Sequence, residues 1–134
     1  MNTPSYYFFD ILVNPEHIDE LRHVNNVIYL QWVQDAVAAH WASKAPASVR
    51  QQYYWVVLRH EIDYKAPAFL GEELIAKTWV HDYSGAKSTR IVQVIRKRDN
   101  KLLVEAHTLW CLMNNRPTRI GEDIKSIFLP DLIR

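Results

Sequence analysis

The stretch VNNVIYLQWVQDAVAAHWAS, residues 24–43, decides the fold. Its polar side chains form only a narrow stripe, made of Gln31, Gln34 and Asp35, and apolar side chains cover most of the remaining circumference. A helix on a protein surface is polar over about half of its circumference. The pattern therefore predicts a long helix over 24–43 that lies deeply buried.

The segments on both sides of this helix are typical of β-strands. Residues 5–13 are rich in Tyr, Phe, Ile and Val, and Asn14-Pro15-Glu16 ends this first strand. After a predicted loop over 44–52, the pattern alternates with a period of two up to Pro67. One predicted face of this second strand carries Leu58, His60, Ile62 and Tyr64, and the other carries Arg59, Glu61, Asp63 and Lys65.

Three more strands are predicted over 72–81, 87–97 and 101–113, followed by a tail with one short helix over 122–128. Consecutive strands joined by short turns pair antiparallel. The economical arrangement is an α+β fold in which a curved antiparallel sheet of five strands wraps around one long central helix. At 134 residues, the chain has the length of a single domain, which we expect to span 1–134.

Composition limits the function and the surroundings. A net charge of +1 argues against a nucleic-acid surface, because phosphate binding needs concentrated positive charge. The only cysteine, Cys111, is expected in the core, and the absence of an internal disulfide suits the cytoplasm. We also expect no membrane span, because no run of about 18 apolar residues occurs.

Just before the helix, the stretch HIDELRHVNNVIYL (residues 17–30) places an acid, a histidine and two asparagines close together. A helix N-terminus offers unpaired N–H groups and the positive end of the helix dipole. Both favour an oxyanion such as the tetrahedral intermediate of thioester cleavage. A carboxylate a few residues upstream can activate water or attack the carbonyl itself.

The pattern Asp19-x-x-x-His23-Val24-Asn25-Asn26-x-x-Tyr29-Leu30 resembles the signature of the 4-hydroxybenzoyl-CoA thioesterase-like branch of the hotdog-fold superfamily. Similar runs occur in bacterial acyl-CoA thioesterases and plant acyl-ACP thioesterases. The likeness continues through residues 62–68 and Gly71-Glu72, and it covers about 6–113. It implies a hotdog fold and an acyl-CoA thioesterase that acts on an acyl-CoA or acyl-carrier-protein substrate. The uncovered edge strands and the high aromatic content predict a homodimer or a dimer of dimers. No metal-ligand spacing occurs in the sequence, so we expect neither a metal nor a cofactor.

The resemblance also implies roles for single residues. Asp19 stands at the position of the catalytic carboxylate, as nucleophile or general base, and His23 would orient Asp19 or the substrate. The candidate substrate-binding residues are Asn26, Tyr29, Tyr64, Lys87 and Arg90. The last two could meet a coenzyme A phosphate, although solvated strand positions are the alternative.

Two departures from the family pattern stand out. Many relatives have glycine immediately before the histidine, where this chain has Arg22. The plant enzymes have asparagine two residues after the aspartate, where this chain has Leu21. The plant-type constellation is therefore incomplete.

Local rules leave another reading of the motif open. Asn14-Pro15 is a good helix start, and an unbroken helix from Pro15 would make Asp19 and His23 an ordinary pair on one helix face. Three other functions compete with an acyl-CoA thioesterase: an acyl-ACP thioesterase, a non-catalytic module that binds acyl-CoA or acyl carrier protein, and a hotdog dehydratase, for which no paired His/Asp arrangement is found.

Overall fold

The computed structural model describes residues 5–129, and one antiparallel sheet dominates it. The strands are β1 (Tyr7–Leu12), β2 (Tyr54–Tyr64), β3 (Glu73–Ser84), β4 (Lys87–Arg96) and β5 (Lys101–Met113). The helices are α1 (Asn26–Lys44), α2 (Ala47–Gln52) and α3 (Glu122–Lys125), with 3-10 turns at Pro15–His17 and Ser126–Phe128.

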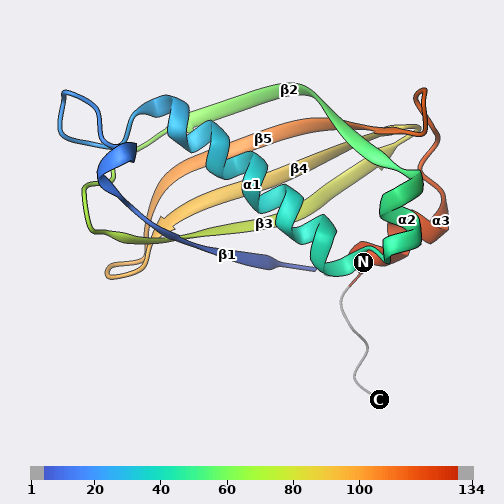
Figure 1. Ribbon diagram of the computed structural model, residues 1–134, viewed down its shortest axis with the longest axis horizontal. Coiled ribbons are helices and arrows are strands. Elements are labelled where there is room, and N and C mark those ends of the chain that lie inside the picture. Colours follow the sequence, from blue (N-terminus) through green and yellow to red (C-terminus); the bar gives the residue numbers. More distant parts are fainter. Residues whose placement is uncertain (1–4, 130–134) are drawn as a thin grey trace, which may run out of the picture.

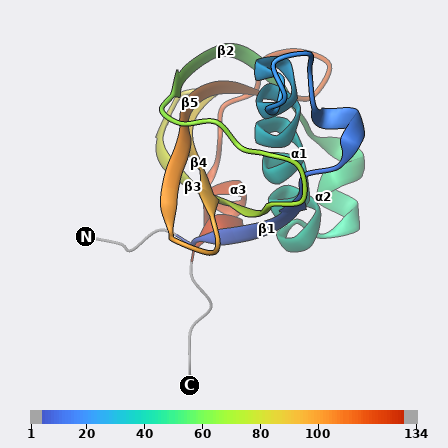
Figure 2. The ribbon, with the colours of Figure 1, turned by 90° about the vertical axis from the view of Figure 1, so that its left-hand side faces the viewer.

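The strand order in the sheet is β1-β3-β4-β5-β2, and every neighbouring pair is antiparallel. The sheet curves around α1, with β2 at one edge and β1 at the other (Figures 1 and 2). The predicted α+β architecture, five antiparallel strands wrapped around one long helix, is confirmed.

The helix α1 begins at Asn26 because the side chain of Asn25 caps it, accepting a hydrogen bond from the Val27 N–H at 3.0 Å. It ends at Lys44, two residues before Pro46, which disfavours helical backbone in the residue preceding it. The face of α1 toward the sheet is fully buried, through Tyr29, Trp32, Val33, Ala36, Val37 and His40.

The prediction of a deeply buried helix is correct for this face only. On the other side Val27 is 69% exposed, and Ala38 and Ala42 are exposed as well. A single curved sheet covers only one side of a helix, so the apolar outer side of α1 has no cover from residues 5–129.

The structure also corrects two details of the predicted elements. Residues 47–52, predicted as loop, form α2 directly after Pro46, because proline is tolerated at a helix start. In β2, a bulge between Val57 and Arg59 shifts the alternation. Leu58 is therefore 50% exposed and does not share a face with His60 and Ile62, which face α1.

The sheet itself is continuous around Cys111, which lies in β5 between Lys87 of β4 and Val56 of β2. Its thiol is buried, as predicted. None of the helices in the described part of the chain is long and apolar enough to cross a membrane.

Tyr29 fixes the start of α1 to the loop after β2. Its hydroxyl oxygen accepts a hydrogen bond from the Ala68 N–H at 3.0 Å, and both residues are buried. Burial raises the pKa of the Tyr29 hydroxyl. Nearby, the more exposed Tyr64 hydroxyl donates to the Asn26 carbonyl at 3.3 Å.

We predict that Tyr29→Phe lowers the free energy of unfolding by about 1–3 kcal/mol, because it leaves the buried Ala68 N–H without a partner. Tyr64→Phe is the matched control. Water can replace its exposed hydroxyl, so its cost should stay below about 1 kcal/mol. Urea denaturation of both variants measures the difference, and equal losses would contradict it.

The turn before α1 is strained at Arg22, whose φ of 68° lies in the left-handed region. This is the position at which many relatives of the predicted family have glycine. Glycine adopts this conformation at no steric cost. The arginine therefore stands where the backbone favours glycine.

We expect Arg22→Gly to raise the free energy of unfolding by about 0.5–1 kcal/mol, because it removes the steric cost of the left-handed conformation. Arg22→Ala keeps a Cβ at the strained position and should give no such gain. Thermal or chemical denaturation checks both variants. A gain with alanine as large as with glycine would show that the backbone conformation is not the cause.

Candidate functional site

The motif residues 18–24 form a small hairpin rather than a helix. Ile18 and Val24 form an isolated antiparallel bridge, and the Asp19 N–H donates to the His23 carbonyl at 3.1 Å. The Arg22 N–H in turn donates to the Asp19 carbonyl at 3.0 Å. The alternative of an unbroken helix from Pro15 is therefore wrong, because the helical turn at Pro15–His17 stops before Asp19.

Asp19 is held by this turn. One carboxylate oxygen, Oδ1, accepts a hydrogen bond from the Leu21 N–H at 2.8 Å, and the side chain is only partly buried. The second oxygen, Oδ2, has no hydrogen-bond partner among residues 5–129. A carboxylate with one fixed and one free oxygen is oriented and still able to accept a proton.

A pocket with a volume of about 240 Å³ lies beside the start of α1. Its walls come from His23 and the first turn of α1 on one side and from the end of β2 and the loop after it on the other. The lining residues are His23, Val24, Asn26, Tyr29, Tyr64, Lys65, Ala66 and Pro67. Four predicted site residues, His23, Asn26, Tyr29 and Tyr64, thus lie around one pocket.

The rings of Tyr29 and Tyr64 meet edge to face, with centroids 5.8 Å apart. The Nδ1 atom of His23 lies 3.3 Å from the Val24 carbonyl oxygen, so Nδ1 carries the proton in this contact. In the tautomer that carries its only proton on Nδ1, the Nε2 atom of His23 is an acceptor. A lone pair beside a pocket can bind a water molecule or a substrate hydrogen.

The amides of the first turn of α1, beside this pocket, differ in whether they have a hydrogen-bond partner. The Val27 N–H is taken by the Asn25 side chain, and the Ile28 N–H donates to the Asn25 carbonyl at 2.9 Å. The Asn26 N–H has no partner within the described chain. Because Asn26 lines the pocket, this amide is the candidate oxyanion donor.

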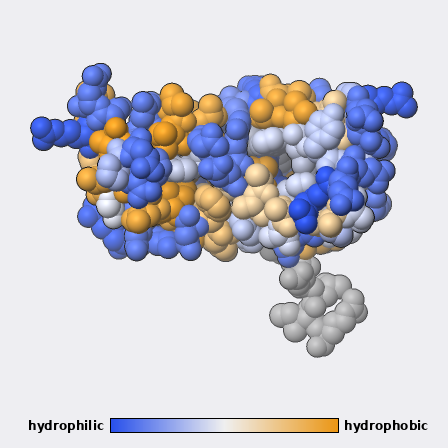
Figure 3. Space-filling view, in the orientation of Figure 1, coloured by the Kyte–Doolittle hydropathy of each residue, from blue (hydrophilic) through white to orange (hydrophobic). Residues whose placement is uncertain are grey.

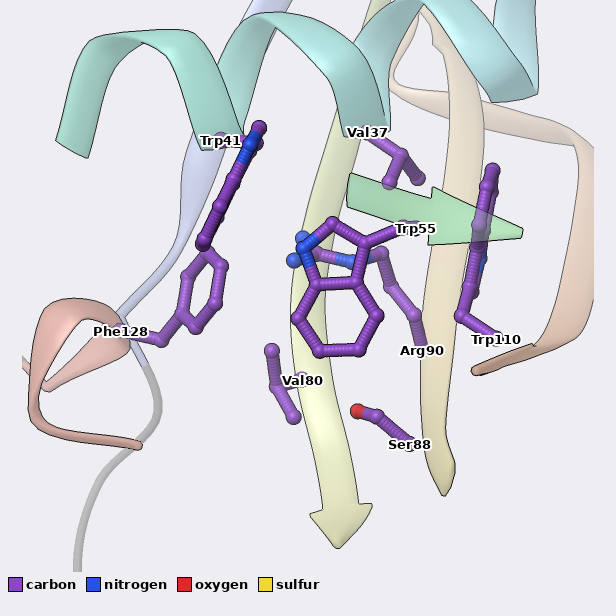
Figure 4. A pocket seen from close by; sticks show the side chains of 8 residues that line it. All are labelled: Val37, Trp41, Trp55, Val80, Ser88, Arg90, Trp110 and Phe128. Atoms are coloured by element: carbon purple, nitrogen blue, oxygen red, sulfur yellow. The ribbon is translucent and has the colours of Figure 1, made fainter. Parts of the chain in front are cut away.

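The other predicted residues lie elsewhere. Asp19 precedes the pocket in the hairpin and is not part of its wall. Lys87 is exposed at the start of β4, at the far end of the sheet, roughly 20 Å along the strand from the level of Tyr64. Arg90 lines a different cavity, under the C-terminal half of α1 (Figure 4).

Arg90 corrects the expectation of a solvated strand residue. The Arg90 side chain lies on the sheet face that α1 covers, and it is only 5% exposed. Burial lowers the pKa of its guanidinium to about 10. Arg90 neighbours His40 of α1. Burial and the positive charge of Arg90 lower the pKa of His40 to about 3.

Sequence reasoning missed two parts of these sites. Lys65, Ala66 and Pro67 complete the pocket wall, and the signal for them was the resemblance of residues 62–68 to the family. His40 was hidden in an apolar helix pattern. No feature of the sequence alone pairs it with Arg90, 50 positions along the chain.

Comparison with solved structures shows the same fold in proteins of low sequence identity. A 1,4-dihydroxy-2-naphthoyl-CoA thioesterase from Synechocystis superposes with a TM-score of 0.81 at 15% identity, covering 91% of this chain and 94% of that one. A DHNA-CoA thioesterase from Staphylococcus aureus gives a TM-score of 0.79 at 18% identity, covering 91% and 87%. A second Staphylococcus aureus protein, solved in complex with CoA, gives a TM-score of 0.80 at 15% identity, covering 100% and 90%.

These likenesses show that the hotdog fold predicted for this chain is correct. No curated protein matches the sequence significantly. The sequence profile of the thioesterase-like superfamily, however, matches residues 13–128, which includes the motif hairpin, α1 and all strands except β1. This chain belongs to the thioesterase-like superfamily.

Proposed function

We propose that this protein is an acyl-CoA thioesterase that hydrolyses the thioester of an acyl-coenzyme A to the free acid and CoA. The observation that carries the proposal is the arrangement at the start of α1. Asp19, whose carboxylate has one hydrogen-bonded and one unpaired oxygen within the described chain, lies in the same short hairpin as His23. His23 in turn lines a pocket together with Asn26, whose backbone amide has no partner among residues 5–129.

In this mechanism the thioester carbonyl enters the pocket with its oxygen toward the Asn26 N–H. Asp19 takes a proton from a water molecule through its free oxygen, and the water oxygen attacks the carbonyl carbon. The helix-start amide stabilises the negative charge on the oxygen of the tetrahedral intermediate. Collapse of the intermediate breaks the carbon–sulfur bond, and the sulfur leaves with a proton as the CoA thiol.

Asp19 as nucleophile is the other form of the same proposal. One carboxylate oxygen would then attack the carbonyl carbon directly, the carbon–sulfur bond would break with release of the CoA thiolate, and water would hydrolyse the resulting anhydride to the free acid and the Asp19 carboxylate. In both forms His23 is a positioning residue that orients Asp19 or the substrate. Tyr29 and Tyr64 provide the apolar wall for the acyl group next to the thioester.

The choice of coenzyme A rests on the structural neighbours. Two of them are CoA thioesterases by name, and one was solved with CoA. An acyl-ACP substrate is the alternative for the same chemistry. A non-catalytic module that binds acyl-CoA is the alternative from a different class, since fold alone does not fix function.

We expect Asp19→Asn to reduce kcat/KM for acyl-CoA hydrolysis at least ~100-fold, the usual scale for loss of a general base, with the fold unchanged. Glu20→Gln is the matched control, because Glu20 is the next residue, acidic and exposed, and it should retain full activity. The assay is a screen of acyl-CoAs of increasing chain length and of aryl-CoAs.

Full activity of Asp19→Asn would remove Asp19 from the mechanism. If the wild-type protein binds acyl-CoA but turns over none of the screened substrates, the binding module is the better description. Circular dichroism and the melting temperature of each variant show whether a loss of activity comes from unfolding.

We further propose that the enzyme acts as a dimer joined along β2. This strand is eleven residues long and lies at the edge of the sheet, so one side of its backbone is unpaired. The pocket volume of about 240 Å³ falls below the roughly 300–1,000 Å³ typical of small-molecule sites. A partner strand beside Tyr64 and Lys65 would complete it.

Exposed apolar side chains near the start of α1 also support a subunit interface at this end of the molecule. Figure 3 shows apolar side chains interrupting the hydrophilic surface on the side where α1 begins. The exposed large apolar residues near this end are Leu12, Leu21, Val27, Tyr64, Phe69 and Leu70. Several exposed apolar side chains at one end of a molecule are typical of an interaction site.

We expect the double variant Val56→Lys, Leu58→Lys, at two exposed positions of β2, to shift the protein toward the monomer, because two copies would bring like charges together across the strand pair. Phe8→Lys places a single lysine on the other edge strand, β1, at a residue that is 54% exposed, close to the 50% of Leu58. Light scattering after size exclusion measures the mass. A wild-type monomer, or equal effects at the two edges, would contradict a β2 interface.

A further inference from the structure

The cavity around Arg90 has a feature that the proposed thioesterase mechanism does not use. The guanidinium is 5% exposed, yet no carboxylate lies within ion-pair distance of it among residues 5–129. Its hydrogen bonds go through Nη1, to His40 Nδ1 at 2.7 Å and to Thr78 Oγ1 at 3.5 Å. An isolated buried charge is costly, and buried charges are ordinarily paired.

A second arginine on the same strand shows the usual solution. Arg96 is 8% exposed and faces Asp99 through two hydrogen bonds, of 3.0 and 2.8 Å, and Glu72 at 3.5 Å. Among residues 5–129, carboxylates therefore pair with one buried arginine of β4, Arg96, and none pairs with the other, Arg90. Arg90 keeps Nε and Nη2 without a partner in the described chain.

His40 adds a further unmatched donor to the same cluster. It is fully buried, and its Nδ1 accepts the hydrogen bond of Arg90, so the ring proton sits on Nε2. That Nε2 atom has no hydrogen-bond partner in the part of the chain that the structure describes. The lowered pKa of His40 agrees with a neutral ring, so the described residues of the cluster provide one cation and unpaired N–H donors but no anion.

The walls around Arg90 are aromatic. Figure 4 shows the arginine side chain passing behind the ring of Trp55, with Trp110 on one side and Trp41 and Phe128 on the other. The Phe128 ring lies over the guanidinium, 5.0 Å from its central carbon to the ring centroid. Flat apolar surfaces next to a fork of N–H donors match a ligand with a carboxylate at one end and a flat apolar body at the other.

We propose that this cavity binds an organic carboxylate with a flat apolar body, of the aryl carboxylate class, through an ion pair with Arg90. The body of the acid lies among the rings of Trp55, Trp110 and Phe128. The site is separate from the pocket at the start of α1, and the inference does not rest on the proposed hydrolysis, although acids of this class are among the products a thioesterase releases.

Occupation of the site requires Phe128 to move. The space between the walls is about 10 Å³, room for roughly one water molecule. Phe128 comes from the 3-10 turn Ser126–Phe128 and not from the sheet, so its displacement leaves the strand pairing intact. In the closed state its ring covers the cation at the place where the body of the acid would lie.

Benzoate is the probe, and benzyl alcohol, which has the same ring without the charge, is the matched ligand. In isothermal titration calorimetry, we expect the wild-type protein to bind benzoate at least tenfold more tightly than benzyl alcohol. Quenching or a shift of tryptophan fluorescence should accompany binding, because Trp41, Trp55 and Trp110 all line the cavity. Equal affinity for the two ligands would overturn the proposal without any variant.

Arg90→Met and Arg96→Met form a matched pair of variants. Arg90→Met should weaken benzoate binding at least tenfold and should not lower the melting temperature of the free protein, since it removes an unpaired buried charge. Arg96→Met should keep benzoate binding and lower the melting temperature, since it leaves Glu72 and Asp99 without their cation. A fall in melting temperature for Arg90→Met as large as for Arg96→Met, with benzoate binding unchanged, would show that Arg90 serves only the fold.

Activity separates this inference from the proposed function. If Asp19→Asn retains full hydrolysis while benzoate still binds through Arg90, the thioesterase mechanism fails and the carboxylate site stands. If Asp19→Asn is inactive and benzoate binds no better than benzyl alcohol, the mechanism stands and the carboxylate site fails.

Discussion

The packing of α1 into the concave face of the sheet is the constraint on which the rest of the structure depends. The helix buries a continuous apolar face against strands that come from almost the whole chain, from Ile11 in β1 to Ala106 in β5. Its ends are thereby fixed relative to the sheet. The start of α1 meets the loop after β2, where the Tyr29 hydroxyl binds the Ala68 amide, and the hairpin that carries Asp19 and His23 is held against that junction.

The same packing divides the concave face into two chemically different regions. Near the start of α1 the cavity is open and contains a free amide and a histidine. Under the C-terminal half of α1 it is nearly closed and contains a buried guanidinium between aromatic rings. The core of the fold also includes Val33, Ala36 and Val92, each of which is fully buried. Only the first region was expected from the motif.

Local pattern predicted the regular parts of this fold well. The strand over 101–113 has the predicted bounds, and the short helical tail over 122–128 is present as α3 and the turn after it. Period-two alternation failed at Leu58, because a bulge is a property of two paired strands and cannot be seen in one strand. The helix Ala47–Gln52 was missed because proline and serine favour loops and helix starts alike.

Prediction of the site was limited in a different way. His23, Asn26 and Tyr29 are close in sequence, so one motif was enough to place them around a pocket. Arg90 was expected either at a coenzyme A phosphate or at a solvated strand position, because charged residues are almost never fully buried without a partner. Its partner His40 is 50 positions away, and their contact is set by the curvature of the sheet over α1. No spacing rule within the sequence contains that information.

The buried position of Cys111 makes its thiol a probe of local unfolding of the sheet. The thiol is buried near the end of β5, opposite Lys87 of β4 and Val56 of β2, and it is the single cysteine of the chain. An alkylating reagent can reach it only when β5 separates from a neighbour or the packing beside it opens. The rate of modification by such a reagent therefore follows the population of opened molecules rather than motion at the chain termini.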